Sequence, residues 1–194
     1  MPQANPQIST RELLLDAAEH LFATRGYQST TIKQVAEQVG VQGPAIYKHF
    51  DGKRDLFEQV LERLFTPFLD LLADGAAAGG DQGAIMRQHL SNPNASRIVQ
   101  HATLSGGEDL ALLVERWYRP FFREVPKDAD AAPSGFTPVS VMAFHSMLLG
   151  YLTLAPLHEA IFATDPLGED ALAELLQLQQ RLAAAVANTK SRPD

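Results

Sequence analysis

The sequence contains no cysteine, and this absence excludes several kinds of site at once. Without thiols the chain cannot form a disulfide framework, a thiolate zinc site or a cysteine nucleophile, and such a composition suits an intracellular protein. The first ten residues (MPQANPQIST) also lack the basic segment and the apolar run of a signal peptide. We therefore expect a cytoplasmic protein rather than a secreted one.

The sequence motifs of common enzyme classes are missing as well. There is no HExxH or ExxH pair, no glycine-rich phosphate loop and no G-x-S-x-G, and His158-Glu159 has no second histidine one turn later. Three further histidines are far apart in the sequence and could meet only through folding: His89, His101 and His145. We expect no metal, no cofactor and no catalysis, and a helical enzyme is the most remote alternative.

The charge of the chain is unevenly distributed. Its net charge is −7 at pH 7, yet residues 1–54 carry six Lys or Arg against five Asp or Glu, a net of +1. Residues 55–194 carry ten against eighteen, a net of −8. This distribution permits phosphate contacts by the first segment but does not by itself indicate them.

The hydrophobic spacing is helical in every periodic segment, and no strand-period segment of any length occurs. The sequence therefore predicts an all-α fold. The apolar run over 139–157 has no basic flanks, so we interpret it as a buried helix rather than a membrane span. The expected helices cover residues 9–26, 32–39, 43–50, 54–74 (bent near Pro67), 84–90, 95–104, 108–125, 137–154 and from 165 or 168 to 186, with loops at 74–83 and 126–135.

Residues 32–50 satisfy the packing rules of a helix-turn-helix. Thr31 and Gln34 form a capping box that begins the first helix. Ala36 is the small residue where the two helices approach each other, and Gly40, four residues on, takes a tight turn with positive φ. The interior is filled by Val35, Val39, Val41 and Ile46. An ordinary helical hairpin that binds nothing fits this pattern equally well.

The residues expected to face outward favour DNA binding. They offer hydrogen-bond donors, a compact cation and small residues that permit close approach: Thr31, Lys33, Gln42, Gly43, Ala45, Lys48 and His49. Glutamine can read an adenine edge, alanine can contact a thymine methyl, and lysine and histidine can reach phosphates. We expect the ring of Tyr47 to pack while its hydroxyl reaches the backbone.

The run TTIKQVAEQVGVQGPAIYKHFDGKRDLF (residues 30–57) resembles the DNA-binding segment of the tetracycline-repressor (TetR/AcrR) family, as does LFATRGYQSTT before it. The resemblance covers about residues 10–64, and AIYKHF and GKRDLF are its specific parts. It implies a DNA-binding domain (1–53) and a helical effector-binding and dimerisation domain (54–194). It also implies DNA contacts from Thr31, Lys33, Gln42, Pro44, Ala45, Tyr47, Lys48, His49 and Lys53.

The resemblance further implies a homodimer on a palindromic operator, released by a small-molecule effector. Because such a dimer obstructs polymerase by occupying a promoter, repression is favoured over activation. Two positions depart from the family. Gln42 stands where Ser or Thr is common, which weakens the helix cap by on the order of 1 kcal/mol. Gly43 stands where a basic residue is frequent.

Beyond about residue 70 the sequence is compatible with the family but carries no specific motif. In the family the last two long helices pack against their copy, and a monomer core is the alternative for the same residues. The interface candidates are Ala143, Ser146, Gly150, Leu176, Leu182 and Ala183.

The resemblance also implies an effector cavity among the middle helices. Trp117 with Phe121 and Tyr118 with Phe122 form i,i+4 aromatic pairs. Polar or adaptable groups are added by His101, His145, Met147 and Tyr151. All of these residues would also suit a plain core. The lack of clustered buried charges favours a lipophilic effector.

A further alternative for the function of the chain is an interaction module whose helix-turn-helix is purely architectural.

Overall fold

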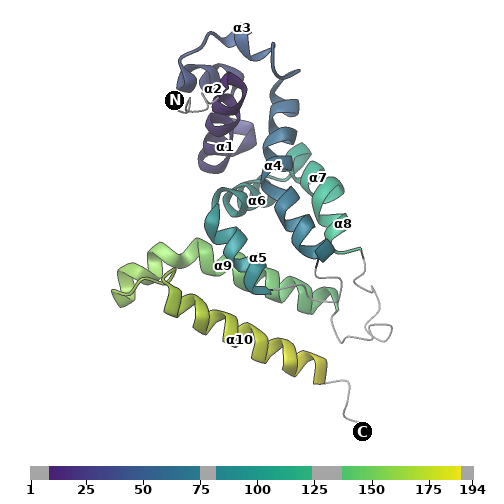
Figure 1. The fold of residues 1–194 in the computed structure, drawn as a ribbon, viewed down its shortest axis with the longest axis vertical. Coiled ribbons are helices and arrows are strands. Elements are labelled where there is room, and N and C mark those ends of the chain that lie inside the picture. Colours follow the sequence, from purple (N-terminus) through teal and green to yellow (C-terminus); the bar gives the residue numbers. More distant parts are fainter. Residues whose placement is uncertain (1–8, 75–81, 124–136, 189–194) are drawn as a thin grey trace, which may run out of the picture.

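The computed structural model describes residues 9–74, 82–123 and 137–188, and every regular element within these ranges is helical (Figure 1). The predicted all-α fold is therefore confirmed. The elements are α1 (Thr10–Ser29), α2 (Ile32–Val39), α3 (Gly43–Ile46), α4 (Lys53–Asp74), α5 (Gln82–Ser91), α6 (Asn94–Ser105), α7 (Gly107–Leu113), the π-helical η1 (Val114–Tyr118), α8 (Arg119–Phe121), α9 (Pro138–Phe162) and α10 (Glu169–Asn188).

The helices are arranged along one long axis. Helices α1–α3 lie at one end, α9 and α10 lie at the other, and α4 runs from the first group toward the second (Figure 1). Helix α4 packs on α1 and also contacts α5 and α6. This arrangement leaves the helix-turn-helix at a free end of the molecule.

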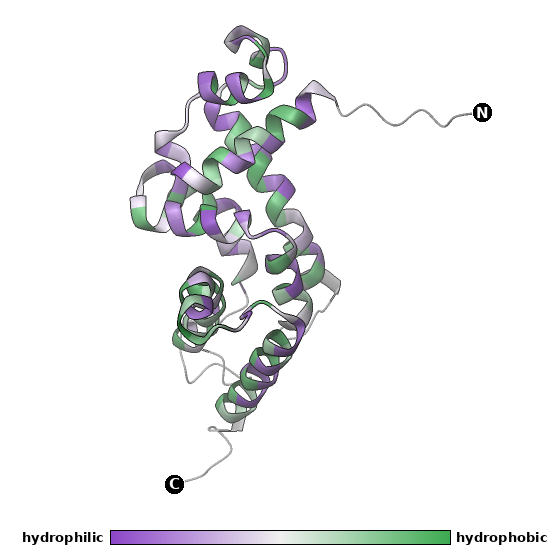
Figure 2. Ribbon diagram, turned by 90° about the vertical axis from the view of Figure 1, so that its left-hand side faces the viewer, coloured by the Kyte–Doolittle hydropathy of each residue, from purple (hydrophilic) through white to green (hydrophobic). Residues whose placement is uncertain are grey.

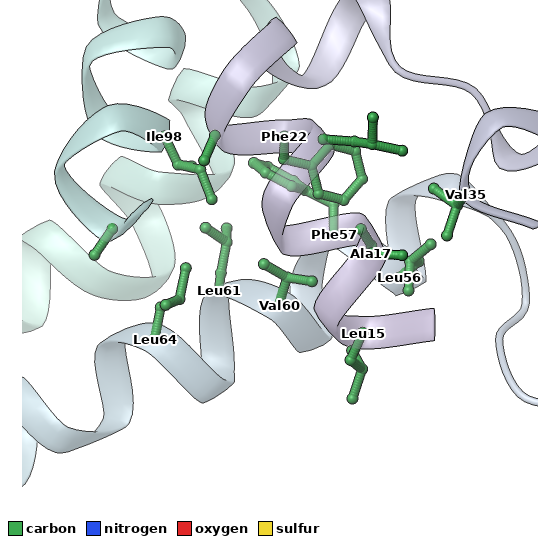
Figure 3. Packing of buried hydrophobic residues seen from close by; sticks show 14 of the residues in the cluster. Leu15, Ala17, Phe22, Val35, Leu56, Phe57, Val60, Leu61, Leu64 and Ile98 are labelled. Carbon is green, nitrogen blue, oxygen red and sulfur yellow. The ribbon is translucent and has the colours of Figure 1, made fainter. Parts of the chain in front are cut away.

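One apolar core joins α1, α2 and α4 to α6, α7 and η1 (Figure 3). At its centre the rings of Phe22 and Phe57 meet edge to face, with centroids 4.9 Å apart, and Tyr27 lies 4.7 Å from Phe57. Ile98 of α6 belongs to the same cluster. The core therefore continues across the domain division that we place after residue 53, and that division stays a prediction.

Three predicted helix ends differ from the structure. Gly26 has positive φ (+78°), as expected of a helix stop, but helical turns resume after it and α1 ends at Ser29. The expected helix over 108–125 is divided by the π-helical η1. Helix α9 continues through Pro156 to Phe162, because one proline removes a single backbone donor while buried Ala155 still anchors the helix. The predicted loops over 74–83 and 126–135 fall largely outside the described residues.

Helix α9 is not the buried helix that we predict from its composition. Among its residues only Leu148 and Ala155 are buried, and a second, smaller core joins Leu148 to Met86 of α5 and Leu175 of α10. Hydrophobic residues run along both α9 and α10 (Figure 2). By length and composition alone α9 could cross a membrane, and within the described ranges no other helix could.

Candidate nucleic-acid interface

The turn between α2 and α3 is built as the sequence predicts. The hydroxyl of Thr31 accepts a hydrogen bond from the backbone N–H of Gln34 (3.2 Å), and the Gln34 side chain accepts one from the Thr31 N–H (2.8 Å). This reciprocal pair is the predicted capping box. Gly40 then adopts the left-handed conformation (φ +77°, ψ 23°) with open space where a Cβ would lie. Glycine is therefore required there by the backbone and not by crowding.

Helix α3 is shorter than predicted. It spans Gly43–Ile46 and continues as a turn, in which the N–H of His49 donates to the carbonyl of Ile46 (2.9 Å). Gln42 occupies the N-cap without a side-chain hydrogen bond, in agreement with the weak cap expected there. The missing cap and Gly43 both disfavour a longer helix. Buried Ile46 and Phe50 fix the segment on the core.

Most of the predicted DNA contacts are exposed. The exposed members are Thr31, Lys33, Gln42, Pro44, Tyr47, Lys48 and His49, while Gly43, Ala45 and Lys53 are half-buried. We call these ten residues the reading face. Its backbone is held from beneath by Ile46 and Phe50, so the surface side chains are presented by a fixed support.

The prediction that the ring of Tyr47 packs against the protein is wrong. The residue is 61% exposed, because Ile46 and Phe50 already fill the interior positions on either side of it. An aromatic ring left in water at the tip of a helix-turn-helix is available to a partner. Its exposure therefore strengthens its place in the reading face.

Lys53 differs from the other cations of the reading face. Its Nζ lies 4.2 Å from the centroid of the Tyr27 ring and donates a hydrogen bond to the carbonyl of Gln28 (3.4 Å). Burial lowers the pKa of the Lys53 ammonium, and the carboxylate of Asp109 partly offsets that shift. The side chain thus points back toward α1 and α7.

Sequence reasoning missed Arg11 as a member of this surface. Its guanidinium carbon lies 5.4 Å from the ring centroid of Phe50, and its side chain remains 44% exposed. Arg11 is on α1, some thirty residues before α3, so no local motif links them. Only the fold places this additional cation beside the turn that follows α3.

Two of the predicted effector residues, one from η1 and one from α9, contact each other. The Tyr118 hydroxyl and the Nε2 of His145 share a hydrogen bond (3.2 Å). Burial raises the pKa of Tyr118 above its usual range and lowers the pKa of His145. Both groups are therefore uncharged at neutral pH. The predicted pairing of Tyr118 with Phe122 is confirmed, with ring centroids 6.0 Å apart.

Trp117 lies beside this pair. It is 6% exposed and packs on Phe65, with ring centroids 5.8 Å apart. Its Nε1 has no hydrogen-bond partner in the described part of the chain. A buried N–H without an acceptor is costly, so this group could receive an acceptor from a bound molecule.

The other predicted effector residues are dispersed. Met147 and Tyr151 pack against the smaller core, and the Tyr151 hydroxyl donates to the Pro166 carbonyl (2.7 Å). His101 lies against Gly26 of α1 and lines an open surface hollow of about 310 Å³. The side chain of Phe121 lies outside the described residues.

Sequence reasoning considered His89 only as a metal ligand. The structure buries it in α5, with its ring 4.5 Å from that of Phe68 and its Nδ1 2.9 Å from the Ser96 hydroxyl. Burial, with a smaller contribution from His145, lowers its pKa to about 4. Among the described residues no group of three His, Asp or Glu side chains is placed to hold a metal ion.

The predicted interface residues lie on α9 and α10. Ala143, Ser146 and Leu182 are exposed, and Gly150 and Ala183 are half-buried. Leu176 instead packs against the smaller core of its own chain.

Large apolar side chains extend the exposed surface at helical spacing. They are Val139 (71% exposed), Met142 (63%), Leu157 (53%) and Ile161 (60%) on α9, and Leu178 (48%) on α10. We call these five residues, with Ala143, Ser146, Gly150 and Leu182, the apolar stripe. On α9 the four large side chains form two pairs at helical spacing, Val139 with Met142 (i, i+3) and Leu157 with Ile161 (i, i+4). They could have been selected from the sequence only with knowledge of which helix face the core occupies.

Comparison with known proteins places the DNA-binding segment in a family. Residues 14–60 match the family model described as bacterial regulatory proteins, tetR family. This segment contains α2, α3 and the start of α4, so the match covers the reading face itself.

Curated relatives resemble the chain over the same segment. The HTH-type transcriptional repressor KstR2 of Rhodococcus jostii is 35% identical over 69 residues, which is 34% of either chain. The HTH-type transcriptional activator FasR of Mycolicibacterium smegmatis is 38% identical over 58 residues, 30% of this chain and 26% of its own. The chain thus spans about a third of the length of these relatives.

Similarity of fold extends over nearly the whole chain. A crystal structure of a transcriptional regulator from Streptomyces coelicolor has a TM-score of 0.62 and covers 90% of this chain and 98% of its own, at 22% sequence identity. At that identity the comparison establishes the fold alone.

Proposed function

Residues 14–60 match the tetR family of bacterial regulatory proteins, and we propose from this premise that the chain is a regulator of that family, which controls transcription by binding duplex DNA through α2, α3 and the turn between them. The observation that carries the proposal is the reading face. Seven of its ten residues are exposed at a free end of the molecule, while Ile46 and Phe50 beneath them are buried. A rigid, exposed surface of this kind is what a major groove requires.

The reading face divides into two kinds of contact. Gln42, Ala45 and Tyr47 lie on or next to α3 and would reach base edges, by hydrogen bonds or by apolar contact with thymine methyl groups. Thr31 at the start of α2, with exposed Lys33, Lys48 and His49, would contact phosphates. Arg11, whose guanidinium is hydrogen-bonded to Glu12 and Gln59 in the free chain, would exchange these partners for a further phosphate. The acidic remainder of the chain stays away from the duplex.

The apolar stripe supports a homodimer. An exposed row of large apolar side chains on two neighbouring helices is costly in water, and a second copy covers it through a twofold axis. Two reading faces related by that axis would bind half-sites about 34 Å apart, or one turn of DNA, on a palindromic operator. A regulator of this kind acts in the cytoplasm.

Release by an effector is supported by the group formed by buried Trp117 with half-buried Tyr118 and His145. Tyr118 and His145 carry no charge, and Trp117 offers an unpaired N–H donor. These features favour a neutral, lipophilic molecule with one hydrogen-bond acceptor. Trp117 is the one tryptophan of the sequence, so its fluorescence reports binding directly. A medium-chain alkanol should change this fluorescence at a lower concentration than the alkanoate of the same chain length does. Equal responses to the two compounds would contradict a preference for a neutral effector.

Occupation of a promoter favours repression over activation. Of the two relatives, KstR2 is named a repressor and FasR an activator. The choice between repression and activation is tested by transcription in vitro from a promoter that carries the duplex sequence which the chain binds. Lower transcript yield on addition of the chain is the expected result, and higher yield would contradict it.

The proposal is tested by selecting duplexes from a randomised library with the purified chain, followed by titration of the recovered duplex. Lys48→Ala should weaken binding and reduce the slope of log K against log salt by about one unit. Tyr47→Ala should weaken binding without changing that slope. The matched control is Arg97→Ala, which removes an exposed cation from α6 and should leave the affinity within about twofold.

An architectural helix-turn-helix would give a different result. In that case no sequence is enriched, and Lys48→Ala and Arg97→Ala have equal effects on residual binding. Either outcome would contradict the proposed function.

A further inference from the structure

The N-terminus of α4 and the N-terminus of α7 meet in one small crevice. It is lined by Tyr27, Arg54, Phe57, Glu108, Asp109 and Leu112. Helix α4 brings cations to this place, Lys53 and Arg54, and the first turn of α7 brings two carboxylates, Glu108 and Asp109. The crevice therefore joins the end of the reading face to the half of the chain that we propose binds the effector.

Asp109 is unusual among the acidic residues of the chain. It is 2% exposed, and within the described ranges neither of its carboxylate oxygens has a hydrogen-bond partner. Its Oδ1 lies close to the backbone, because a Cβ built on Gly107 would lie only 3.6 Å from it. A buried carboxylate without partners is unfavourable, and a neutral residue would pack in this position at lower cost.

Lys53 lies beside this carboxylate, because its Nζ is 4.2 Å from the centroid of the Tyr27 ring, and Tyr27 lines the same crevice as Asp109. Lys53 has two weak partners, the ring of Tyr27 and the carbonyl of Gln28, and no ion pair within 4 Å is formed between Lys53 and any described residue. Its ammonium is thus held at Tyr27, beside the crevice that Asp109 lines, without forming an ion pair there. The same ammonium belongs to the reading face, and it cannot remain over Tyr27 and reach a DNA phosphate at once.

We propose that Asp109 and the DNA backbone compete for the ammonium of Lys53, so that the position of α7 sets how readily Lys53 reaches a phosphate. The inference rests on the proposed function. Asp109 acts here as a positioning residue, since it touches no DNA itself. A shift of α7 that brings Asp109 nearer to Lys53 weakens DNA binding, and a shift away strengthens it.

The chain supplies a direct mechanical route to α7. The π-helical η1 follows α7 without a break and contains Trp117 and Tyr118. Arg116 of η1 also donates a hydrogen bond to Glu58 of α4 (2.7 Å), one turn beyond Lys53. A molecule bound against Trp117 would therefore displace the segment that carries Asp109.

The test measures binding of the chain to the duplex recovered by selection, by fluorescence anisotropy at several salt concentrations. Asp109→Asn should tighten binding about three- to tenfold, since it removes the competing charge at nearly constant shape. Asp170→Asn is the matched control: it removes the same charge from the first turn of α10 and should change affinity by less than about twofold.

Lys53 identifies the mechanism. Lys53→Met should weaken binding and lower the salt slope by about one unit, and in this background Asp109→Asn should have no further effect. If Asp109→Asn acts no more strongly than Asp170→Asn, or if its effect persists without Lys53, the proposal is overturned.

Two measurements keep the test decisive. If Asp109→Asn does not fold, exposed Glu108→Gln should tighten binding in the same direction and more strongly than Asp170→Asn does, and equal effects of these two variants overturn the proposal. If the wild-type chain selects no duplex, the proposed function fails. The contact is then tested without DNA by a double-mutant cycle of thermal unfolding, in which additive effects of Lys53→Met and Asp109→Asn contradict it.

Discussion

The two ends of this molecule are built differently. Helices α1, α2, α4, α6, α7 and η1 share one core with many fully buried side chains, whereas α9 and α10 share with α5 a core of three buried residues, Met86, Leu148 and Leu175. The first region is complete within one chain. The second leaves the apolar stripe in water, and we infer that it is completed by a second copy.

The difference between the two cores has a functional explanation. A reading face must keep one geometry to recognise a sequence, and the large core gives it a fixed support. A shallow core between α5, α9 and α10 can be displaced at lower cost when a molecule binds or a partner docks. The crevice that Asp109 lines, with Lys53 beside it at Tyr27, belongs to the region with the large core. It is followed along the chain by η1, which leads toward the second region.

The largest expected effect comes from Phe57→Ala, which tests whether the first region is one unit. Because Phe57 packs on both Phe22 and Tyr27, its loss should cost about 3–5 kcal/mol of unfolding free energy. Hydrogen exchange should then show lost protection in α1 and α6 together, with α10 little changed. The control Leu104→Ala, at an 88% exposed site, should cost less than about 0.5 kcal/mol. Loss of protection confined to α1 would contradict the claim that the helices of the first region form one unit.

The next effect tests the second region. Leu157→Glu places a charge in the apolar stripe, so the dimer dissociation constant should rise about 100-fold or more, measured by sedimentation, with helix content unchanged. Gln177→Glu introduces the same charge on an exposed residue of α10 outside the stripe and should leave the dimer intact. A wild-type chain that sediments as a monomer, or equal effects of both variants, would contradict a stripe covered by a partner.

A smaller effect concerns His89, which packs against Phe68 of the first region and stands on α5, whose Met86 belongs to the second core. Its pKa is lowered to about 4 in the folded chain, while the unfolded chain has the ordinary value of about 6.5. Between these values the unfolded state binds more protons, so stability falls as pH decreases from about 6.5 to 4, by on the order of 2 kcal/mol. His89→Gln should flatten this part of the profile in urea titrations. A difference between the two proteins that is independent of pH would exclude the burial of a neutral histidine.

The features that were predicted from the sequence are those decided by neighbouring residues. The capping box of Thr31 and Gln34 and the left-handed Gly40 depend on contacts within a few positions, and the all-α fold follows from spacing alone. The weak cap at Gln42 was also predicted, but the length of α3 was overestimated.

The features that escaped prediction depend on residues far apart in the chain. Arg11 comes near Phe50 only because α1 packs against the segment after α3, and Lys53 turns inward because Tyr27 and Asp109 converge on it. The exposed face of α9 could not be distinguished from a buried one, since apolar composition is the same whether a helix packs on its own chain or on a partner.

The central claim is tested most directly by hydroxyl-radical footprinting of the wild-type chain on its selected duplex. A dimer that presents two reading faces should protect two symmetric half-sites with centres about 34 Å apart, and Tyr47→Ala should remove both protections together. A single protected half-site, or protection unchanged by Tyr47→Ala, would contradict the account.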